Sequence, residues 1–536
     1  MTRRSTPNPT APADSDAFLA RFAWHPEPEL IGYRNEEASR ASLERLGEAT
    51  WRAALDFLYG TAVHRAMGDP AGYESLRSSY FGADGAPSTA PDSPTPAAAI
   101  LDEFGARVAN GLMNAQHPRQ FGYFTPPPLP ISMMGELLAQ MTNQGVDVWH
   151  AGPVAAFVEE EVVRWLCDLV GYGSGSFGLL TSGGVMANFM AMAIARDVHL
   201  GRLLGKGRPP RGGMLDGVRV YTSDQTHFSI ARSLDELGFP PETLAVIPAD
   251  DDFHLRGASV AAAVTRDRAV GLVPFAIAAV AGSTNTGSVD AVGELAGVAA
   301  AEDLWLHVDA AYGGAARLSG RVAPRVPDLE LADSVTVDPH KWFFQAYDIG
   351  GLVVRDGRNL GATFGGRSPE YYRGGETPEA HDSHDEHAGQ LNFYKLGFEG
   401  TRRWRALKLW MSWKHLGTEG FGRLIEANVG LAAYLARQCA EADDFEAVPE
   451  VPELSVVCFR HLPGGRTEAL TLPANALDAH QDALQAALEH SGDGWLTTTR
   501  LRGATYLRAG IVNYLSTEDD IDHLLATLRT LAHQLP

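Results

Sequence analysis

Apolar residues between about residue 112 and residue 405 follow two alternating patterns. The first is a helical spacing, in which one stripe carries Val158, Val162, Trp165, Leu166 and Leu169. The second is a set of short runs of strand length: Val218–Val220, Leu272–Val273, Ile277–Val280, Leu304–Val308 and Leu352–Val354. Strands that alternate with helical segments predict crossover units and a mostly parallel sheet. Such sheets bind ligands at the carboxyl ends of their strands, so the loops after these runs are the candidate positions.

The flanking regions have other patterns. The pattern of residues 18–111 predicts mostly helices. This segment has too few apolar residues to form a hydrophobic core alone, so we expect it to pack on a larger domain. Residues 406–536 predict helices around a few strands, Val456–Phe459 and Tyr506–Val512 among them, and hence a small α+β domain. Residues 1–17 are rich in Pro, Thr, Ala and Ser, which predicts a disordered tail.

Composition narrows the class of protein. The chain has 536 residues, of which 45% are hydrophobic and 21% charged, enough for a large core with smaller domains. Its net charge of −22 would repel nucleic acid and anionic membranes, so we expect neither as a partner. No window of about 18 apolar residues predicts a membrane span. The three cysteines form no CxxC pair, which favours a reducing cytoplasm over a disulfide framework or a zinc site.

A lysine follows one short apolar run, in the segment Asp338-Pro339-His340-Lys341-Trp342. Apolar surroundings disfavour a charged ammonium group, and a neutral amine can attack an aldehyde. A single lysine at a strand end is more commonly a surface side chain whose stem lies on apolar residues. The interpretation of Lys341 therefore depends on other segments that contain residues able to bind a cofactor or catalyse a reaction.

The first such segment is His307-Val308-Asp309-Ala310-Ala311, where a carboxylate ends an apolar run and small residues follow. Pyridoxal 5′-phosphate (PLP) needs a carboxylate against its ring nitrogen, because a protonated pyridinium is the better electron sink. Ala311 is small enough for a ring to lie flat on it. The alternative is that Asp309 only caps the next turn.

The second segment, Ser182-Gly183-Gly184-Val185, leads from a predicted strand into a helix. Backbone N–H groups at a helix start, together with the helix dipole, make a binding site for phosphate. A Gly-Gly pair before a helix is by itself a weak signal. Asn188, in the same helix, is either a cofactor contact or a polar residue of the first helical turn.

Two further loops follow apolar runs. Ser223–Ser229 contains His227, which can stack on a cofactor ring and later handle a proton. A loop histidine bonded only to its neighbours is the alternative. Gly282–Ser288 is polar and contains Thr284, whose hydroxyl can contact the ring oxygen or the substrate.

Taken in order, these segments resemble the group II PLP-dependent decarboxylases, which include aromatic-L-amino-acid, tyrosine, glutamate and diaminobutyrate decarboxylases. The resemblance extends from about residue 117 to residue 522. Asp338–Lys341 is similar to the family's Schiff-base motif, and His307–Ala311 to its ring-nitrogen motif. Gly183-Gly184 lies where the phosphate loop does, and His227 where the stacking histidine does.

The resemblance implies a fold-type I enzyme with a seven-stranded, mostly parallel sheet in residues 112–405. It also implies a small C-terminal domain and an N-terminal helical segment, residues 18–111, that wraps the partner of a homodimer. The expected activity is cytoplasmic conversion of an L-amino acid, as a small-molecule substrate, to its amine and carbon dioxide. The residues expected to hold or act on PLP are Lys341, Asp309, His227, Ala311, Thr284, Gly183, Gly184, Val185, Asp338 and His340.

A polar stretch, residues 367–390, contains the histidine-rich run His381-Asp382-Ser383-His384-Asp385-Glu386-His387. Histidines with carboxylates can bind zinc, but no apolar strands flank these to fix such ligands. We therefore expect no metal, and interpret the stretch as the loop that closes over the substrate in this family.

In aromatic decarboxylases a tyrosine on that loop protonates the substrate carbon, and Tyr394 is our candidate. An ungapped count back from Arg402-Arg403 puts Phe393 at this place instead, and a shift of one residue restores Tyr394. Phe393 there would favour oxidative deamination to an aldehyde, so an aromatic aldehyde synthase is an alternative function.

The substrate pocket has conflicting signals. Tyr123 and Phe124 favour an aromatic amino acid, whereas Asp147 indicates a polar or cationic side chain, as in a diaminobutyrate- or glutamate-type decarboxylase. Asp147 can also be a solvent-facing residue. We expect an aromatic substrate. The alternative that is not an enzyme is an inactive, PLP-free fold that acts as a dimeric binding protein.

Overall fold

The computed structural model describes residues 36–60, 65–66, 72–82, 86–205, 208–366, 391–469 and 471–535. The predicted tail, residues 1–17, and the predicted closing loop with its histidines, residues 367–390, lie outside these ranges. Contacts divide the chain into two compact units. One lies within Met1–Val63 and Ala71–Leu112, and the other within His64–Pro70 and Met113–Pro536.

The first unit is helical in its described part. Its α-helices are α3 (Glu36–Tyr59), α4 (Gly72–Phe81) and α5 (Ala97–Glu103), and α5 continues into a short π-helical turn, η2 (Phe104–Val108). Contacts between α3 and α5 and between α4 and η2 hold it together. None of the helices in the described ranges of either unit is both long and apolar enough to cross a membrane.

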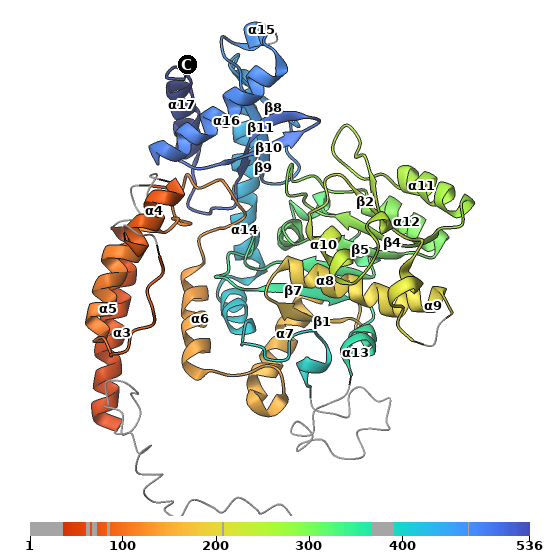
Figure 1. Ribbon diagram of the computed structural model, residues 1–536, viewed down its shortest axis with the longest axis horizontal. Helices are drawn as coiled ribbons and strands as arrows, with labels where there is room; N and C mark the ends of the chain where they lie inside the picture. Colours follow the sequence, from red (N-terminus) through yellow and green to blue (C-terminus); the bar gives the residue numbers. More distant parts are fainter. Residues whose placement is uncertain are drawn as a thin grey trace, which may run out of the picture. The chain divides into compact units, whose positions relative to one another are not determined.

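A seven-stranded sheet forms the centre of the second unit (Figure 1). Its strands are β1 (Phe177–Thr181), β2 (Val218–Ser223), β3 (Leu244–Ile247), β4 (Val273–Val280), β5 (Trp305–Asp309), β6 (Ser334–Val337) and β7 (Gly350–Val354). They lie in the order β1-β7-β6-β5-β4-β2-β3, and only β7 runs antiparallel to its neighbours. The predicted mostly parallel, seven-stranded sheet is therefore confirmed.

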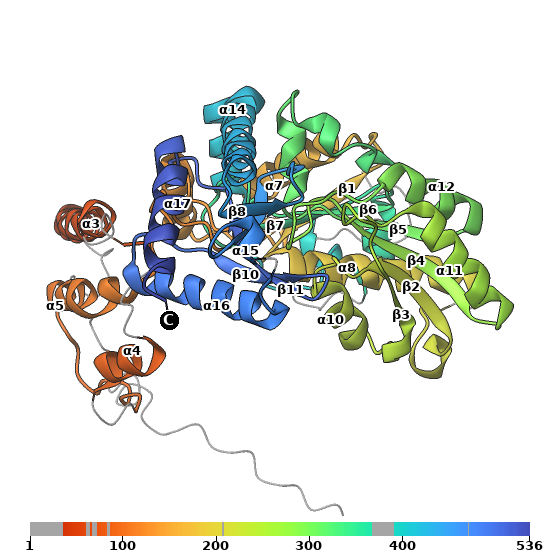
Figure 2. The same cartoon turned by 90° about the horizontal axis from the view of Figure 1, so that it is seen from above.

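Both faces of this sheet are buried, which explains why its strands are apolar runs rather than alternating ones. Successive residues enter different cores: Leu180 and Leu306 belong to one cluster, and Leu179 and Trp305 to the other. Helices cover both faces (Figure 2). They are α7 (Pro153–Val170), α11 (Gly257–Ala269) and α12 (Val292–Glu302) in the first cluster, and α8 (Gly184–Ile194) and α10 (Ser229–Glu236) in the second.

One expectation about the strands is wrong in detail. The runs Leu272–Val273 and Ile277–Val280 are not two elements, because Val273 and the whole second run belong to the single strand β4, which passes through Pro274. Proline has no N–H to donate to a sheet. The register of β2 against β4 shifts between Arg219 and Val220, where Arg219 lies opposite Pro274, so the sheet accommodates the proline by an irregularity.

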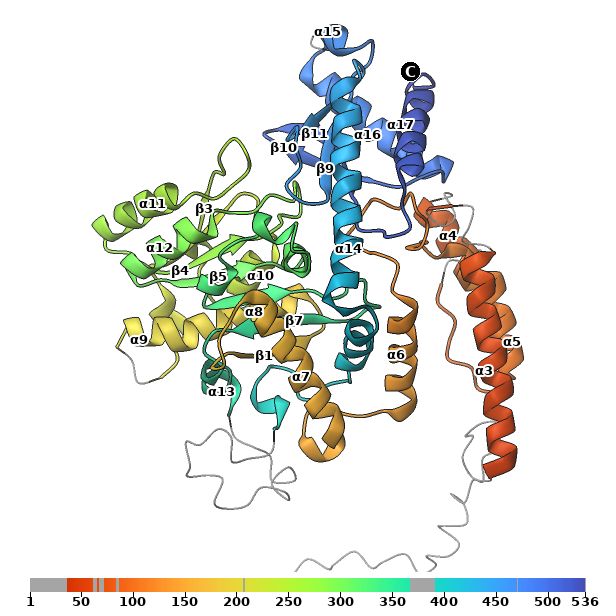
Figure 3. The same cartoon turned by 180° about the vertical axis from the view of Figure 1, so that it is seen from behind.

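A long helix, α14 (Ala406–Glu441), leads from the large sheet to the C-terminal part, as Figure 3 shows, and kinks at Gly417. The C-terminal part has an antiparallel sheet in the order β10-β11-β9-β8. Its strands are β8 (Phe445–Val448), β9 (Val456–His461), β10 (Thr497–Leu501) and β11 (Ala504–Gly510). Helices α16 (Ala474–Ser491) and α17 (Glu518–Ala532) and the second half of α14 share its core.

The remaining helices of the second unit are short or peripheral. They are α6 (Pro130–Thr142), α9 (Gly201–Leu203), α13 (Arg358–Phe364) and α15 (Arg466–Ala469). Helix α6 packs along α14, where Gly135 allows the close approach: a Cβ at this position would lie 2.6 Å from the Cα of Lys408.

Candidate active site

Four of the predicted site segments follow strands that point in the same direction. Asp309 ends β5, Asp338–Lys341 follow β6, Gly183 and Gly184 follow β1, and His227 follows β2. Strand β1 runs parallel to β6, because both are antiparallel to β7. The carboxyl ends of these strands share one edge of the sheet, where α/β proteins bind ligands.

Lys341 lies in a turn directly after β6, where its backbone N–H donates to the carbonyl of Asp338 at 2.9 Å. Its Nζ atom lies 3.3 Å from Asp338 Oδ2. The Asp338 side chain is almost fully buried, whereas that of Lys341 stays 23% exposed. The amine is therefore held by a buried charge and is accessible to a ligand.

The backbone N–H of Gly184, at the start of α8, donates to Asp338 Oδ2 at 2.9 Å. A Cβ at Gly184 would lie only 2.7 Å from this oxygen, so glycine is needed for the approach. The predicted phosphate donor Gly184 thus already has a carboxylate partner. Val185, the next residue, is exposed at the same helix end.

Asp309 is buried and accepts two hydrogen bonds. Its Oδ2 atom accepts from Nδ2 of Asn188 at 2.7 Å, and its Oδ1 atom from the backbone N–H of Ala311 at 3.1 Å. Asn188 is therefore more than a polar residue of a first helical turn. Ala311 lies near the start of α8, because a Cβ at Gly184 would touch its methyl group at 3.4 Å. The ring-nitrogen and phosphate-loop segments thus meet.

His227 is partly buried beside these charges. Burial lowers the pKa of His227, while Asp309 raises it and Lys341 lowers it further. Nδ1 of His227 lies 2.8 Å from Oγ of Ser229. Ser229 links this imidazole to Asn188, which donates to Asp309, and Lys341 follows a strand that ends at the same sheet edge. The structure thus brings together the three residues that the sequence proposed for chemistry.

His340 points back into the protein. Its Nδ1–H donates to the carbonyl of Ile349 at 2.7 Å, and burial lowers the pKa of His340. Its Nε2 atom lies 3.7 Å from Asp338 Oδ2. The ring of Tyr347 packs against the imidazole, with 4.7 Å between centroids. His340 therefore lies beside Asp338 and anchors the loop that follows Lys341.

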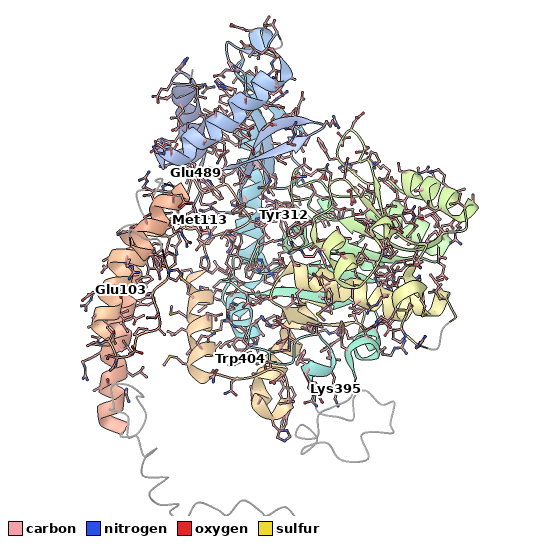
Figure 4. The ribbon with its side chains drawn as sticks, viewed as in Figure 1. Glu103, Met113, Tyr312, Lys395, Trp404 and Glu489 are labelled. Carbon is pink, nitrogen blue, oxygen red and sulfur yellow. The ribbon has the colours of Figure 1, made fainter. Side chains whose placement is uncertain are left out.

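Phe124 is linked to the site by stacked rings. It stacks on Tyr312 at a centroid distance of 4.1 Å, and Tyr312 stacks on Trp342 at 4.8 Å. Tyr312 follows Ala311 in the chain and lies near the centre of Figure 4. Tyr123 is 58% exposed and packs edge-on against Trp495. Phe124, rather than Tyr123, is thus the aromatic residue connected to the Lys341 segment.

Arg508 was not among the predicted site residues, yet it lies among them in the structure. Its Nε atom donates to the carbonyl of Thr284 at 2.7 Å and its Nη1 atom to that of Gly122 at 2.8 Å. The guanidinium lies 4.9 Å from the Phe124 ring centroid. Its buried Nη2 atom has no hydrogen-bond partner among the described residues. The signal in the sequence was one arginine inside the apolar strand β11.

Asp147 and Tyr394 are joined through their backbones. The backbone N–H of Tyr394 donates to the carbonyl of Asp147 at 3.1 Å. In Figure 4, Lys395, the neighbour of Tyr394, lies near the lower edge of the molecule, away from Tyr312. Phe393 is fully buried, and the guanidinium of Arg402 lies 4.9 Å from its ring centroid.

The residues at the sheet edge fit PLP. An accessible lysine amine, a buried carboxylate and a helix start next to glycines are the groups that an aldehyde, a ring nitrogen and a phosphate require. No group of residues suited to a metal ion occurs in the described part of the chain. Fold and site together define a PLP-dependent enzyme of fold type I.

The family is defined more closely by comparison with known proteins. The chain belongs to the pyridoxal-dependent decarboxylase family, whose conserved domain matches residues 82–462. It is 31% identical to an aromatic-L-amino-acid decarboxylase of Bacillus atrophaeus over 81% of this chain and 85% of that protein. It is 27% identical to an L-2,4-diaminobutyrate decarboxylase of Acinetobacter baumannii over 80% and 82%.

A solved structure agrees with this assignment. It is the glutamate decarboxylase domain of a diaminobutyrate-pyruvate transaminase and L-2,4-diaminobutyrate decarboxylase from Vibrio parahaemolyticus. The TM-score is 0.80 at 26% identity, and the match covers 95% of this chain and all of that one. The predicted PLP-dependent decarboxylase family and its fold are therefore confirmed.

Proposed function

We propose that this decarboxylase removes the α-carboxyl group of an aromatic L-amino acid and releases the amine and carbon dioxide. The observation that carries the proposal is the meeting of Lys341, Asp309 and His227 at one sheet edge, with Phe124 stacked on the adjoining Tyr312. The first three residues supply what PLP chemistry requires. The fourth is buried, and its stacked ring makes the core beside these residues aromatic.

Bound PLP would accept the electrons that are left when the bond from Cα to the carboxylate breaks. Lys341 would hold the cofactor through its amine and return to it after each turnover. Asp309 would keep a proton on the ring nitrogen. His227 would cover one ring face and Ala311 the other, which excludes water from the reacting carbon. Thr284 would contact the cofactor from the adjoining loop, and His340 would hold the turn of Asp338 and Lys341 in place.

The anionic group of the substrate has a candidate partner in Arg508. A buried charge without a partner is costly, and the Nη2 atom of Arg508 has unused donors. Its contact with Thr284 and its position over Phe124 place these donors beside the proposed pocket. We assign Arg508 to a carboxylate of the substrate.

One observation supports clean decarboxylation over aldehyde formation. Phe393, which favoured aldehyde formation, is buried in the hydrophobic core. Tyr394 is the more exposed of the two neighbours, so we keep it as the candidate proton donor.

We also propose that the enzyme is a homodimer in the cytoplasm. Large apolar side chains are exposed on α6 and α7, where a second copy of the chain would cover them; they are Leu137, Leu138, Met141, Val154 and Phe157. The three cysteines are all free thiols, as expected in a reducing compartment.

A panel of amino acids tests the proposed reaction. We expect phenylalanine, tyrosine, tryptophan or 3,4-dihydroxyphenylalanine to give amine and carbon dioxide in equal amounts, without hydrogen peroxide. Carbon dioxide, amine, aldehyde and peroxide are all measured in each reaction. Peroxide with aldehyde would identify an aldehyde synthase. Turnover of diaminobutyrate or glutamate alone would contradict the aromatic substrate.

The carboxylate of Asp338 gives a second prediction. It lies at the helix start where the PLP phosphate is expected, and two anions there repel each other. Asp338→Asn keeps an acceptor for Gly184 but removes the charge. We expect the apoprotein to bind PLP about three- to tenfold more tightly, ~1 kcal/mol. Fluorescence titration with PLP measures this. Weaker PLP binding by this variant would mean that the Asp338 carboxylate favours PLP binding because it holds the Lys341 amine in place.

A further inference from the structure

The side chain of Asn188 lies at the centre of a buried hydrogen-bond network. Its Nδ2 atom donates to Asp309 Oδ2 at 2.7 Å and to Ser229 Oγ at 2.8 Å. Its Oδ1 atom accepts from Thr336 Oγ1 at 2.7 Å and from His307 Nε2 at 3.0 Å. The amide thus uses its whole capacity of two donors and two lone pairs. These four bonds join α8 to α10, β5 and β6.

The orientation of the amide follows from its partners. A carboxylate only accepts, so the Asn188 atom that faces Asp309 must be the NH₂ group. The opposite oxygen then requires a donor at Nε2 of His307. Burial lowers the pKa of His307 to about 4, so this imidazole is neutral and its Nδ1 atom must accept. Ser334 Oγ, 2.9 Å away, is the matching donor, and it accepts from Trp305 Nε1 in turn.

The other arm of the network reaches His227. Ser229 Oγ accepts from Asn188 and has one proton left to donate, and Nδ1 of His227 lies 2.8 Å away. The backbone N–H of Ser229 also points at this nitrogen, at 3.4 Å. Both contacts make Nδ1 an acceptor. The proton of the neutral imidazole is therefore on Nε2.

We propose that Asn188 is a positioning residue that couples Asp309 to His227. Through one amide it orients the carboxylate expected at the ring nitrogen, and through Ser229 it sets the tautomer of the imidazole expected on the ring face. The two groups then form one rigid unit with strands β5 and β6. This inference rests on the proposed roles of Asp309 and His227 toward PLP.

The test of this coupling is Asn188→Asp, which keeps the shape of the side chain but replaces the donor that faces Asp309 by oxygen. The variant apoprotein is titrated with PLP, and protein fluorescence and the absorbance of bound cofactor are recorded. We expect affinity for PLP to fall about 10- to 100-fold, because a charge-assisted hydrogen bond becomes a repulsion. Gln481→Glu is the matched control, since Gln481 is a buried amide in the C-terminal domain.

A second variant tests only the hydrogen bonds that lead from Asn188 through Ser229 to His227. It also keeps the proposal testable if Asn188→Asp does not fold. Ser229→Ala leaves the bond between Asn188 and Asp309 intact but removes the hydroxyl donor to Nδ1 of His227. We expect PLP affinity within about twofold of wild type, a kcat lowered about tenfold, and a displaced acid limb of the kcat profile against pH. Ser233→Ala, which removes another buried hydroxyl of α10, is the control.

The outcomes separate this inference from the proposed function. Wild-type protein that binds no PLP would contradict the proposed function itself. If wild type binds PLP and folded Asn188→Asp binds it equally well, only the coupling role of Asn188 is wrong. The coupling is also wrong if Ser229→Ala and Ser233→Ala have the same kcat and the same pH profile.

Discussion

Lys341→Ala is expected to abolish the visible absorbance band of bound PLP and to lower decarboxylation by about four orders of magnitude, ~5.5 kcal/mol. Lys341 is the accessible amine at the sheet edge, and its Nζ atom is held 3.3 Å from Asp338. Without it the cofactor has no covalent attachment to the protein. The substrate amine must then react with the free aldehyde of PLP. After the reaction, no lysine amine is present to displace the product amine from the cofactor.

The same substitution has a structural consequence that can be measured separately. Asp338 is buried, and its Oδ1 atom has no hydrogen-bond partner among the described residues. Removing the Lys341 ammonium leaves the Gly184 N–H as the remaining close donor. We therefore expect a lower Tm in the apoprotein, from a loss of about 1–3 kcal/mol.

Two lysine variants make the result specific. Lys414→Ala removes a half-exposed lysine of α14 and is expected to change neither absorbance nor rate. Lys341→Arg keeps a positive charge near Asp338 but has no neutral amine, so it should restore stability without restoring activity. A band that persists in folded Lys341→Ala would show that another amine holds the cofactor.

The order of the candidate site segments along the chain was predictable because parallel strands buried on both faces appear as apolar runs. Asp309 ends one such run and Lys341 lies in the turn after another, and strands of one direction end at one edge of the sheet. Crossover connections make these strands parallel neighbours in one sheet, so Asp309 and Lys341 lie close together at its edge. Strand β4 appeared as two separate apolar runs in the prediction, and Pro274 lies between them.

The partners of the site residues were not predictable in the same way. Asn188 and Asp309 are 121 positions apart, and nothing local shows that an amide on α8 meets a carboxylate at the end of β5. The contact of Asp338 with Gly184 joins two loops 154 positions apart. Both depend on which strands are neighbours in the sheet. The backbone contact between Asp147 and Tyr394 also joins distant parts of the chain, and no local pattern predicts it.

Asp309→Asn is expected to lower kcat by about 10²- to 10³-fold while PLP stays bound to Lys341. An asparagine oxygen can still accept from Asn188 or from the backbone N–H of Ala311, so the packing of this buried site is largely kept. What disappears is the negative charge that holds a proton on the ring nitrogen. An unprotonated ring is a poorer acceptor for the electrons released with carbon dioxide.

Single-turnover release of carbon dioxide measures this effect without interference from product release. The matched control is Asp290→Asn, because Asp290 is also a buried aspartate and accepts backbone N–H groups from Leu255 and Val280. That control is expected to lower the Tm but to leave kcat of the folded enzyme unchanged. If both variants lose the same activity, the loss in Asp309→Asn comes from general disturbance of the fold. If Asp309→Asn alone loses it while the cofactor band remains, the charge of Asp309 drives the bond-breaking step.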